Sequence, residues 1–86
     1  MKEETFKTVN SKGTELEVTV GIKNEGYGWF EVYDIETGGE HIYCEGGLWF
    51  YTDNGVTYLQ DYDGVYELPK SVEDKLVEWG YSMDWI

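Results

Sequence analysis

The sequence predicts an α+β fold that is mostly β. We expect an antiparallel meander of six or seven strands, with one short C-terminal helix packed on the sheet, in a single domain over residues 1–86. Three observations predict this fold. Apolar and polar residues alternate through most of residues 4–68, Gly and Asn interrupt the runs, and helical spacing begins only after Pro69.

The predicted strands are separated by residues that favour turns. The run TELEVTVGIK alternates most cleanly, since every second residue from Leu16 to Ile22 is apolar. Asp53-Asn54-Gly55 and Asp63-Gly64 indicate hairpins, because type I′ turns need positive φ angles that Asn, Asp and Gly accept. Thr37-Gly38-Gly39 also interrupts the pattern. The strands predicted between these breaks span residues 4–9, 14–23, 27–35, 40–45, 48–52, 56–62 and 65–68.

The one predicted helix lies in KSVEDKLVEWG, residues 70–80. Apolar side chains recur there at helical spacing, at Val72, Leu76 and Trp79. Two starts fit the sequence: a capping box formed by Ser71 and Asp74, or Pro69 as the first helical residue. Gly80 is suited to the position after the last turn. A helix this short is marginal alone, so it must pack on the sheet or close the end of a half-barrel.

The central strands have two unlike faces. The even-numbered positions are apolar and predict the core side: Phe30, Val32, Ile42, Cys44, Leu48 and Phe50. The odd-numbered positions are aromatic or polar: Tyr27, Trp29, Glu31, Tyr33, His41, Tyr43, Glu45, Trp49 and Tyr51. Two interpretations remain open for the odd face. Either the helix or the C-terminal tail covers it, or part of it stays open as an aromatic platform for a Lys/Arg-rich protein surface.

Negative charge dominates the composition. The chain has 18 acidic residues, 6 lysines and no arginine, for a formal net charge of −12. No Lys or Arg lies between Lys23 and Lys70, where ten of the acids lie. Such a chain repels itself and is attracted to basic partners, with a strength that depends on ionic strength. Direct binding of DNA or RNA is disfavoured, because phosphate contacts need a basic patch.

The acids of this central stretch and the rings beside them are the candidate partner-binding residues. The candidates are Glu31, Asp34, Glu36, Glu45, Asp53, Asp61, Asp63, Trp29, Trp49 and Tyr51. Acids at i and i+2, as in Asp61 and Asp63, lie about 6–7 Å apart on one face of a strand, an interval at which carboxylates can imitate phosphates. The competing interpretation is that outward strand positions are commonly charged.

No residue pattern indicates catalysis, a cofactor or a metal site, so we expect a protein that is not an enzyme. His41 and Cys44 would point to opposite sides of a strand, which disfavours a dyad, and they supply too few ligands for a metal. Asp61-Tyr62-Asp63-Gly64 begins like a calcium loop, but Val65 and Val72 occupy ligand positions. Two carboxylates can hydrolyse glycosides, but no feature of the sequence marks any pair of its acids for this reaction.

Cysteine content and the N-terminus indicate a compartment. Cys44 is the one cysteine and has no partner for an internal disulfide, and MKEETFKTVN lacks an apolar segment of the kind that directs secretion. We therefore expect a cytoplasmic protein that does not enter a membrane. The oligomeric state is not indicated by the sequence.

The acidic stretch of residues 24–69, with segments such as YTDNGVTYLQDYDG, resembles in type the small acidic anti-defence proteins carried by phages. These include anti-CRISPR proteins and anti-restriction DNA mimics. The resemblance covers the whole chain loosely and involves no shared motif, so no contact residues are carried over. It implies inhibition of a CRISPR effector or another defence nuclease, in the host cytosol, without chemistry of the protein's own.

Two other functions share some of these features. A carbohydrate-binding or other small-ligand-binding β module would use exposed rings such as Trp29, Trp49 and Tyr51 to stack on sugars. The excess negative charge would not strengthen the binding of an uncharged sugar. An immunity protein against a basic nuclease would have the same physics as the inhibitor and differ in its biological partner.

Overall fold

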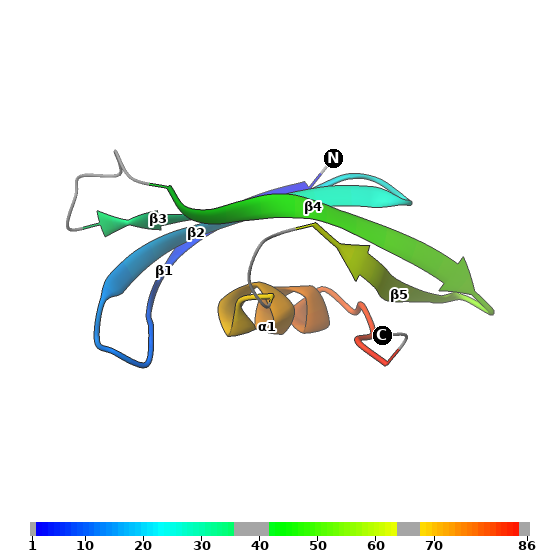
Figure 1. The fold of residues 1–86 in the computed structure, drawn as a ribbon. Coiled ribbons are helices and arrows are strands. Elements are labelled where there is room, and N and C mark those ends of the chain that lie inside the picture. The colour runs from blue at the N-terminus through cyan, green and yellow to red at the C-terminus, as the bar shows by residue number, and fades with distance from the viewer. Residues whose placement is uncertain (1, 36–41, 64–67, 85–86) are drawn as a thin grey trace.

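The computed structural model describes residues 2–35, 42–63 and 68–84, with only the backbone of residues 42 and 43. The elements are β1 (Lys2–Val9), β2 (Glu15–Asn24), β3 (Tyr27–Asp34), β4 (Ile42–Asp53), β5 (Val56–Tyr62) and α1 (Lys70–Glu78). The strands form one antiparallel sheet in the order β1-β2-β3-β4-β5 (Figure 1). The predicted mostly β meander with one C-terminal helix is confirmed.

The predicted count of six or seven strands is wrong, because the described residues form five. The strands predicted at 40–45 and 48–52 are parts of one strand, β4, which continues through Gly46 and Gly47. A methyl group on Gly46 would lie 1.6 Å from the carbonyl oxygen of Asp63, so glycine here lets the chain after β5 pass directly against β4. The strand predicted at 65–68 and the breaks predicted at 37–39 and Gly64 fall largely outside the described residues.

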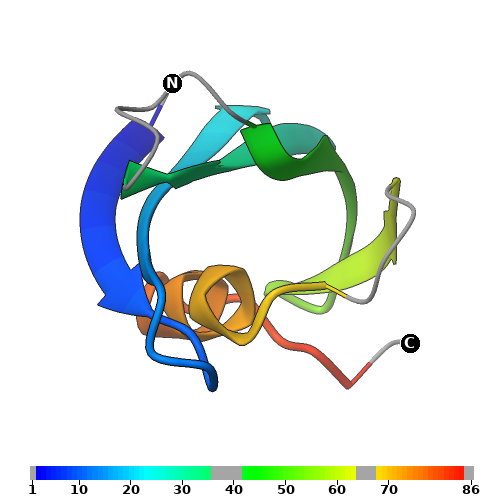
Figure 2. The ribbon, with the colours of Figure 1, turned by 60° about the vertical axis from the view of Figure 1, so that its left-hand side comes forward.

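The sheet curls around α1, which lies on its concave side (Figures 1 and 2). The core fills the space between them with buried side chains: Leu16, Val18, Val20, Ile22, Phe30, Val32, Leu48, Phe50, Leu59, Val72 and Leu76. The even-numbered core positions are thus confirmed wherever side chains are described, with Cys44 half-buried at the margin of the core. The side chain of Ile42 lies outside the described set. Odd-numbered residues lie on the convex side along β1 and β3, on β2 up to Gly21 and on β4 from Glu45. On β5 a register shift between Leu59 and Asp61 instead turns Leu59 inward and Tyr58 and Val56 outward.

The first turn of α1 differs from both predicted starts. Pro69 is the residue before the helix, with φ −57° and ψ 137°, and no side chain caps this end. Its carbonyl oxygen accepts the N–H groups of Val72 and Glu73, at 3.0 and 3.1 Å. The capping box of Ser71 with Asp74 is therefore wrong. Asp74 instead forms an ion pair with Lys70, 2.6 Å from its Nζ atom.

The C-terminal end of α1 follows the prediction for Gly80. Gly80 has φ +94°, its N–H donates to the Val77 carbonyl, and the N–H of Tyr81 donates to the Leu76 carbonyl, both at 2.9 Å. These two bonds define a Schellman motif, which reverses the chain toward the sheet. Ser82 then bonds to β5, accepting from Leu59 at 2.9 Å and donating to Thr57 at 2.8 Å. The tail thereby covers part of the β5 edge.

The tight turns also follow from the sequence. Asn54 and Gly55 have φ angles of 51° and 79°, which confirms the type I′ turn between β4 and β5. In the turn between β1 and β2, the side-chain oxygen of Asn10 accepts the N–H groups of Lys12 and Thr14. These local bonds fix the register of the two hairpins.

Candidate functional site: the outer face of the sheet

The convex side of β3, β4 and β5 carries the predicted aromatic and acidic residues. We call it the outer face, and it comprises Tyr27, Trp29, Glu31, Tyr33, Glu45, Trp49, Tyr51, Asp53, Val56, Tyr58 and Asp61. α1 packs on the opposite side of the sheet (Figure 2). The interpretation in which the helix covers these rings is therefore wrong. Trp85 and Ile86, at the end of the tail, lie outside the described residues.

Glycines allow the rings to lie down on the sheet. A methyl group on Gly21 would lie 2.5 Å from the Trp29 ring, and one on Gly47 would lie 3.0 Å from the Trp49 ring and 3.3 Å from Tyr27. Tyr27 and Trp49 meet edge to face, with ring centroids 5.6 Å apart. Rings of the outer face thus pack over glycines of their own sheet, as in the covering of strand glycines by neighbouring rings.

The rings differ in how much of them reaches solvent. Trp49 is 40% exposed and Tyr51 is 44% exposed, whereas Trp29 is half-buried over Gly21. Part of the aromatic face is therefore open, and part of it is covered by neighbouring side chains on the same face. The large exposed rings lie on β4, the strand with the longest run of outward residues.

Carboxylates lie beside these rings. Glu31 on β3 is the register partner of Glu45 on β4, so two like charges stand directly opposite each other. The Tyr33 hydroxyl donates a 2.9 Å hydrogen bond to Glu31 Oε2. This bond, and the nearby negative charges after it, raise the pKa of Tyr33 above its ordinary value.

Asp53 and Asp61 complete the acidic part of the outer face. Asp61 is the register partner of Trp49, and Asp53 is that of Val56. Asp63 follows β5, is exposed, and its N–H donates to the Gly47 carbonyl at 2.9 Å. The structure thus brings eight of the predicted residues to this side of β3–β5 or its margin: Trp29, Glu31, Glu45, Trp49, Tyr51, Asp53, Asp61 and Asp63.

Asp34 does not belong to this group. It is the register partner of Leu16 and lies on the core side of β3, at the end of the strand. Alternation therefore separates Asp34 from the acids of the outer face, and its part in partner binding stays a prediction. Glu36, the other acid predicted from the same segment, lies outside the described residues.

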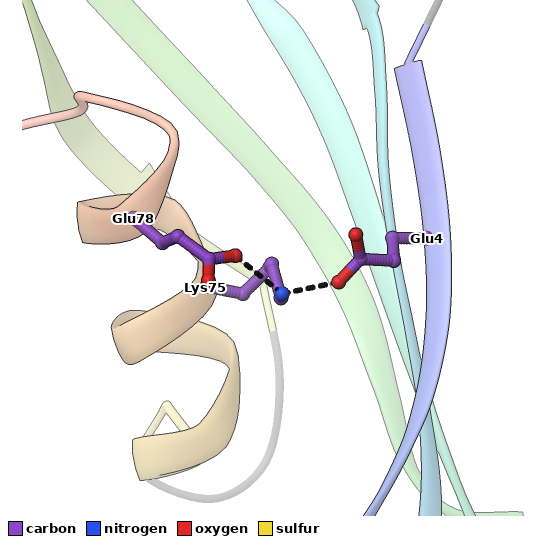
Figure 3. Close-up of polar contacts among 3 residues, drawn as sticks. All are labelled: Glu4, Lys75 and Glu78. Atoms are coloured by element: carbon purple, nitrogen blue, oxygen red, sulfur yellow. Dashed lines mark hydrogen bonds and ion pairs between the residues drawn. The ribbon is translucent and has the colours of Figure 1, made fainter.

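The described lysines with ion-pair or ring contacts lie on the other side of the molecule. Lys75 on α1 forms ion pairs with Glu4 of β1 and with Glu78 (Figure 3). Its Nζ atom also lies 4.9 Å from the centre of the Phe6 ring, and Lys2 Nζ lies 4.7 Å from that of Trp79. These cations attach the helix to the sheet and do not neutralise the outer face of β3–β5.

The residues considered for catalysis or metal binding do not form a site in the part of the chain that the structure describes. Cys44 is half-buried against the core, and burial raises the pKa of its thiol. His41 lies outside the described residues. No group of three or more His, Cys, Asp or Glu side chains that could hold a metal occurs among the described residues.

The sequence did not indicate a cavity, which the structure places at one end of the curled sheet. It has a volume of about 1210 Å³ and lies between the turn after β1 and the first turn of α1. It is lined by apolar side chains such as Leu16, Val32 and Cys44 and by polar ones such as Asn10, Ser71 and Asp74. The cavity arises from how α1 sits against the β1–β2 hairpin, a tertiary feature without a local sequence signal.

No helix in residues 2–35, 42–63 and 68–84 combines the length and apolar character needed to cross a bilayer. No protein-family model matches the chain, and neither the curated proteins nor the solved structures include a significant match to it. The outer face and the cavity are the features of the molecule that bear on its function.

Proposed function

We propose that this protein is a non-catalytic inhibitor that binds a basic, nucleic-acid-handling protein through the outer face and blocks access of nucleic acid to it. The proposed partner is a CRISPR effector or another defence nuclease. One observation carries the proposal: aromatic and acidic side chains stand together on the solvent side of β3–β5, in a stretch of sequence that has no Lys or Arg.

Charge and rigidity both support this function. Acidic side chains steer a molecule toward a cationic surface and raise the rate of productive encounter. The sheet holds Glu31, Glu45 and Asp61 on paired strands, so little conformational freedom is lost on binding. In a nucleic-acid channel these carboxylates would take the place of phosphates, and the rings of Trp49 and Tyr51 would contact Lys or Arg side chains.

The test is inhibition by a charge-reversed variant. We expect Asp61→Lys with Asp63→Lys to lower the affinity for the partner by about tenfold or more, because reversed charges on an interface repel basic residues. The assay measures DNA binding by purified CRISPR effectors and restriction nucleases, in the presence of wild-type or variant protein. Both aspartates are exposed, so the variant should stay folded, which circular dichroism checks.

A matched control separates the site from net charge. Glu73→Lys with Asp84→Lys changes the net charge equally, but on α1 and the tail, and should inhibit nearly as well as the wild type. Equal effects of the two double variants would remove the outer face from the interface. Failure of the wild type to bind any basic nucleic-acid enzyme of the panel would contradict the proposal as a whole.

The cavity supports a second candidate function, the binding of a small ligand. An apolar floor with polar groups around it is the usual character of a small-molecule site. A carbohydrate or another uncharged ligand would bind with little dependence on NaCl concentration, and reversal of Asp61 and Asp63 would leave that binding unchanged. The same variants therefore distinguish the two functions.

A further inference from the structure

The β4–β5 hairpin reaches beyond the rest of the sheet. β3 begins at Tyr27, whose register partner on β4 is Trp49, and β4 continues to Asp53. Residues 49–61, which we call the arm, therefore begin at the last residue paired with β3 and extend beyond it (Figure 1). The molecule is accordingly elongated, with extents of 43 × 24 × 22 Å.

The outward side of the arm carries an exposed apolar strip. Its cross-strand pairs are Trp49 with Asp61, Tyr51 with Tyr58, and Asp53 with Val56. Trp49 is 40%, Tyr51 44% and Val56 40% exposed, so the strip holds three of the five large hydrophobic residues that are exposed in the described part of the chain. The other two, Val9 and Val77, lie on other elements.

The inward side holds the arm in place. The Phe50 and Tyr81 rings stack with centroids 4.8 Å apart, and Ser82 bonds to the backbone of Thr57 and Leu59. The hydroxyl oxygens of Thr52 and Thr57 are 2.9 Å apart, which adds a cross-strand bond. The strip is therefore presented by a supported ribbon, and its side chains lose little further freedom on binding.

The charges beside the apolar strip determine which kind of protein surface can bind over it. Asp53 and Asp61 flank the apolar side chains at both ends, and no Lys or Arg lies anywhere in residues 24–69. A second copy of the chain would bring the same aspartates against each other, which is unfavourable. A surface with an apolar recess and a Lys/Arg rim would bury Trp49, Tyr51 and Val56 and pair the flanking acids.

We propose that the arm is the anchor of the interface: its apolar strip inserts into an apolar recess ringed by Lys and Arg on a basic protein partner. This inference rests on the proposed function and deepens it. Phosphate imitation needs only the carboxylates, whereas an anchor makes affinity depend on Trp49, Tyr51 and Val56. The acids then govern the rate of encounter, and the apolar strip governs the lifetime of the complex.

Two synthetic peptides of equal length and charge test the anchor. One alternates arginine with leucine and the other alternates arginine with serine. Binding is followed by ¹H–¹⁵N NMR titration at about 300 mM NaCl, where exposed charges are largely screened. We expect the leucine peptide to bind about tenfold more tightly than the serine peptide, with the largest shift changes in residues 49–61.

The matched variants are Val56→Ser and Val77→Ser. Val77 is 54% exposed on α1, so both changes remove an exposed valine side chain and differ in its location. We expect Val56→Ser to weaken binding of the leucine peptide about fivefold and Val77→Ser to leave it unchanged. Tyr51→Ala should act like Val56→Ser, and thermal melting shows that each variant is folded.

The anchor is overturned by equal affinity for both peptides, by equal effects of the two valine variants, or by dimerisation of the free protein in sedimentation equilibrium. If the serine peptide binds as well as the leucine peptide and shifts the NMR signals of the outer-face acids, the anchor is contradicted and the charge-based function is supported. If neither peptide binds even at about 50 mM NaCl, the anchor and the proposed function both fall.

Discussion

Glycine residues decide what the outer face looks like. Gly21 and Gly47 have no side chain of their own, and the rings of Trp29, Trp49 and Tyr27 occupy the space that a side chain would take. A strand glycine is usually a weakness, because it has no side chain to pack. Here the missing side chains leave room for the rings to pack against the sheet.

The pKa of a single residue, Tyr33, tests the acidic environment of the outer face. Its hydroxyl donates to Glu31, which stabilises the neutral phenol, so we expect its pKa to lie above the ordinary 10.0. The bond is present at neutral pH and is lost when Tyr33 deprotonates, so its stabilising effect disappears as pH rises through the raised pKa. NMR titration of ¹³Cζ-labelled tyrosine measures this value.

The control for Tyr33 is Tyr81. Burial, rather than a carboxylate, raises the pKa of Tyr81, so Glu31→Gln should lower the pKa of Tyr33 and leave that of Tyr81 unchanged. A Tyr33 pKa at or below 10.0 in the wild type would show that the bond to Glu31 is absent in solution.

Alternation along the strands predicted the residues of the outer face well. Trp29, Glu31, Glu45 and Trp49 share a face because odd-numbered positions of β3 and β4 pair with each other from Tyr27–Trp49 to Glu31–Glu45. The same rule places Asp34 with Val32 on the core side, away from the acids of the outer face. Alternation cannot say which side the helix covers, and so could not establish that Trp49 and Tyr51 are exposed.

At the scale of elements, β4 shows where turn signals mislead. Gly46-Gly47 looks like a break, yet both residues lie within a strand of 12 residues. One glycine makes room for the rings above, and the other makes room for the Asp63 carbonyl below. These needs come from neighbouring segments, so a local pattern cannot distinguish such glycines from those of a turn.

Gly46→Ala tests this account of β4. The new methyl group would lie 1.6 Å from the Asp63 carbonyl oxygen, a backbone atom that cannot rotate away. We expect a loss of about 1–3 kcal/mol in the free energy of unfolding, measured by urea denaturation. Gly26→Ala is the control, because its methyl group would meet nothing closer than 3.8 Å and should change stability by less than about 0.5 kcal/mol. Equal stabilities of the two variants would contradict the close contact at Gly46.

The sequence predicted the C-terminal end of α1 but not its N-terminal end. Gly80 at the C-terminal end has the positive φ that only glycine adopts readily, and its position after helical spacing identified it. The N-terminal end offered two signals, Pro69 and the Ser71–Asp74 pair. The local sequence did not indicate which of them begins the helix. Asp74 pairs with Lys70 across one turn, which leaves Ser71 without the bond that a capping box requires.

At the scale of the whole molecule, all six lysines lie outside β3–β5. Lys75 and Lys2 lie between the sheet and α1 or its end, where they contact acids and rings. The outer face of β3–β5 has acids and rings without a cation. Composition predicted the excess of negative charge, whereas the cavity and the reach of the arm depend on tertiary packing that composition does not determine.

The rate of association with the proposed nuclease partner, measured by stopped flow at increasing NaCl concentration, tests the central claim most directly. If acids on the outer face guide the protein to a basic partner, the association rate constant should fall about tenfold between about 50 and 300 mM NaCl. The dissociation rate should change far less, because the apolar contacts are not screened. An association rate that is independent of salt would contradict the claim.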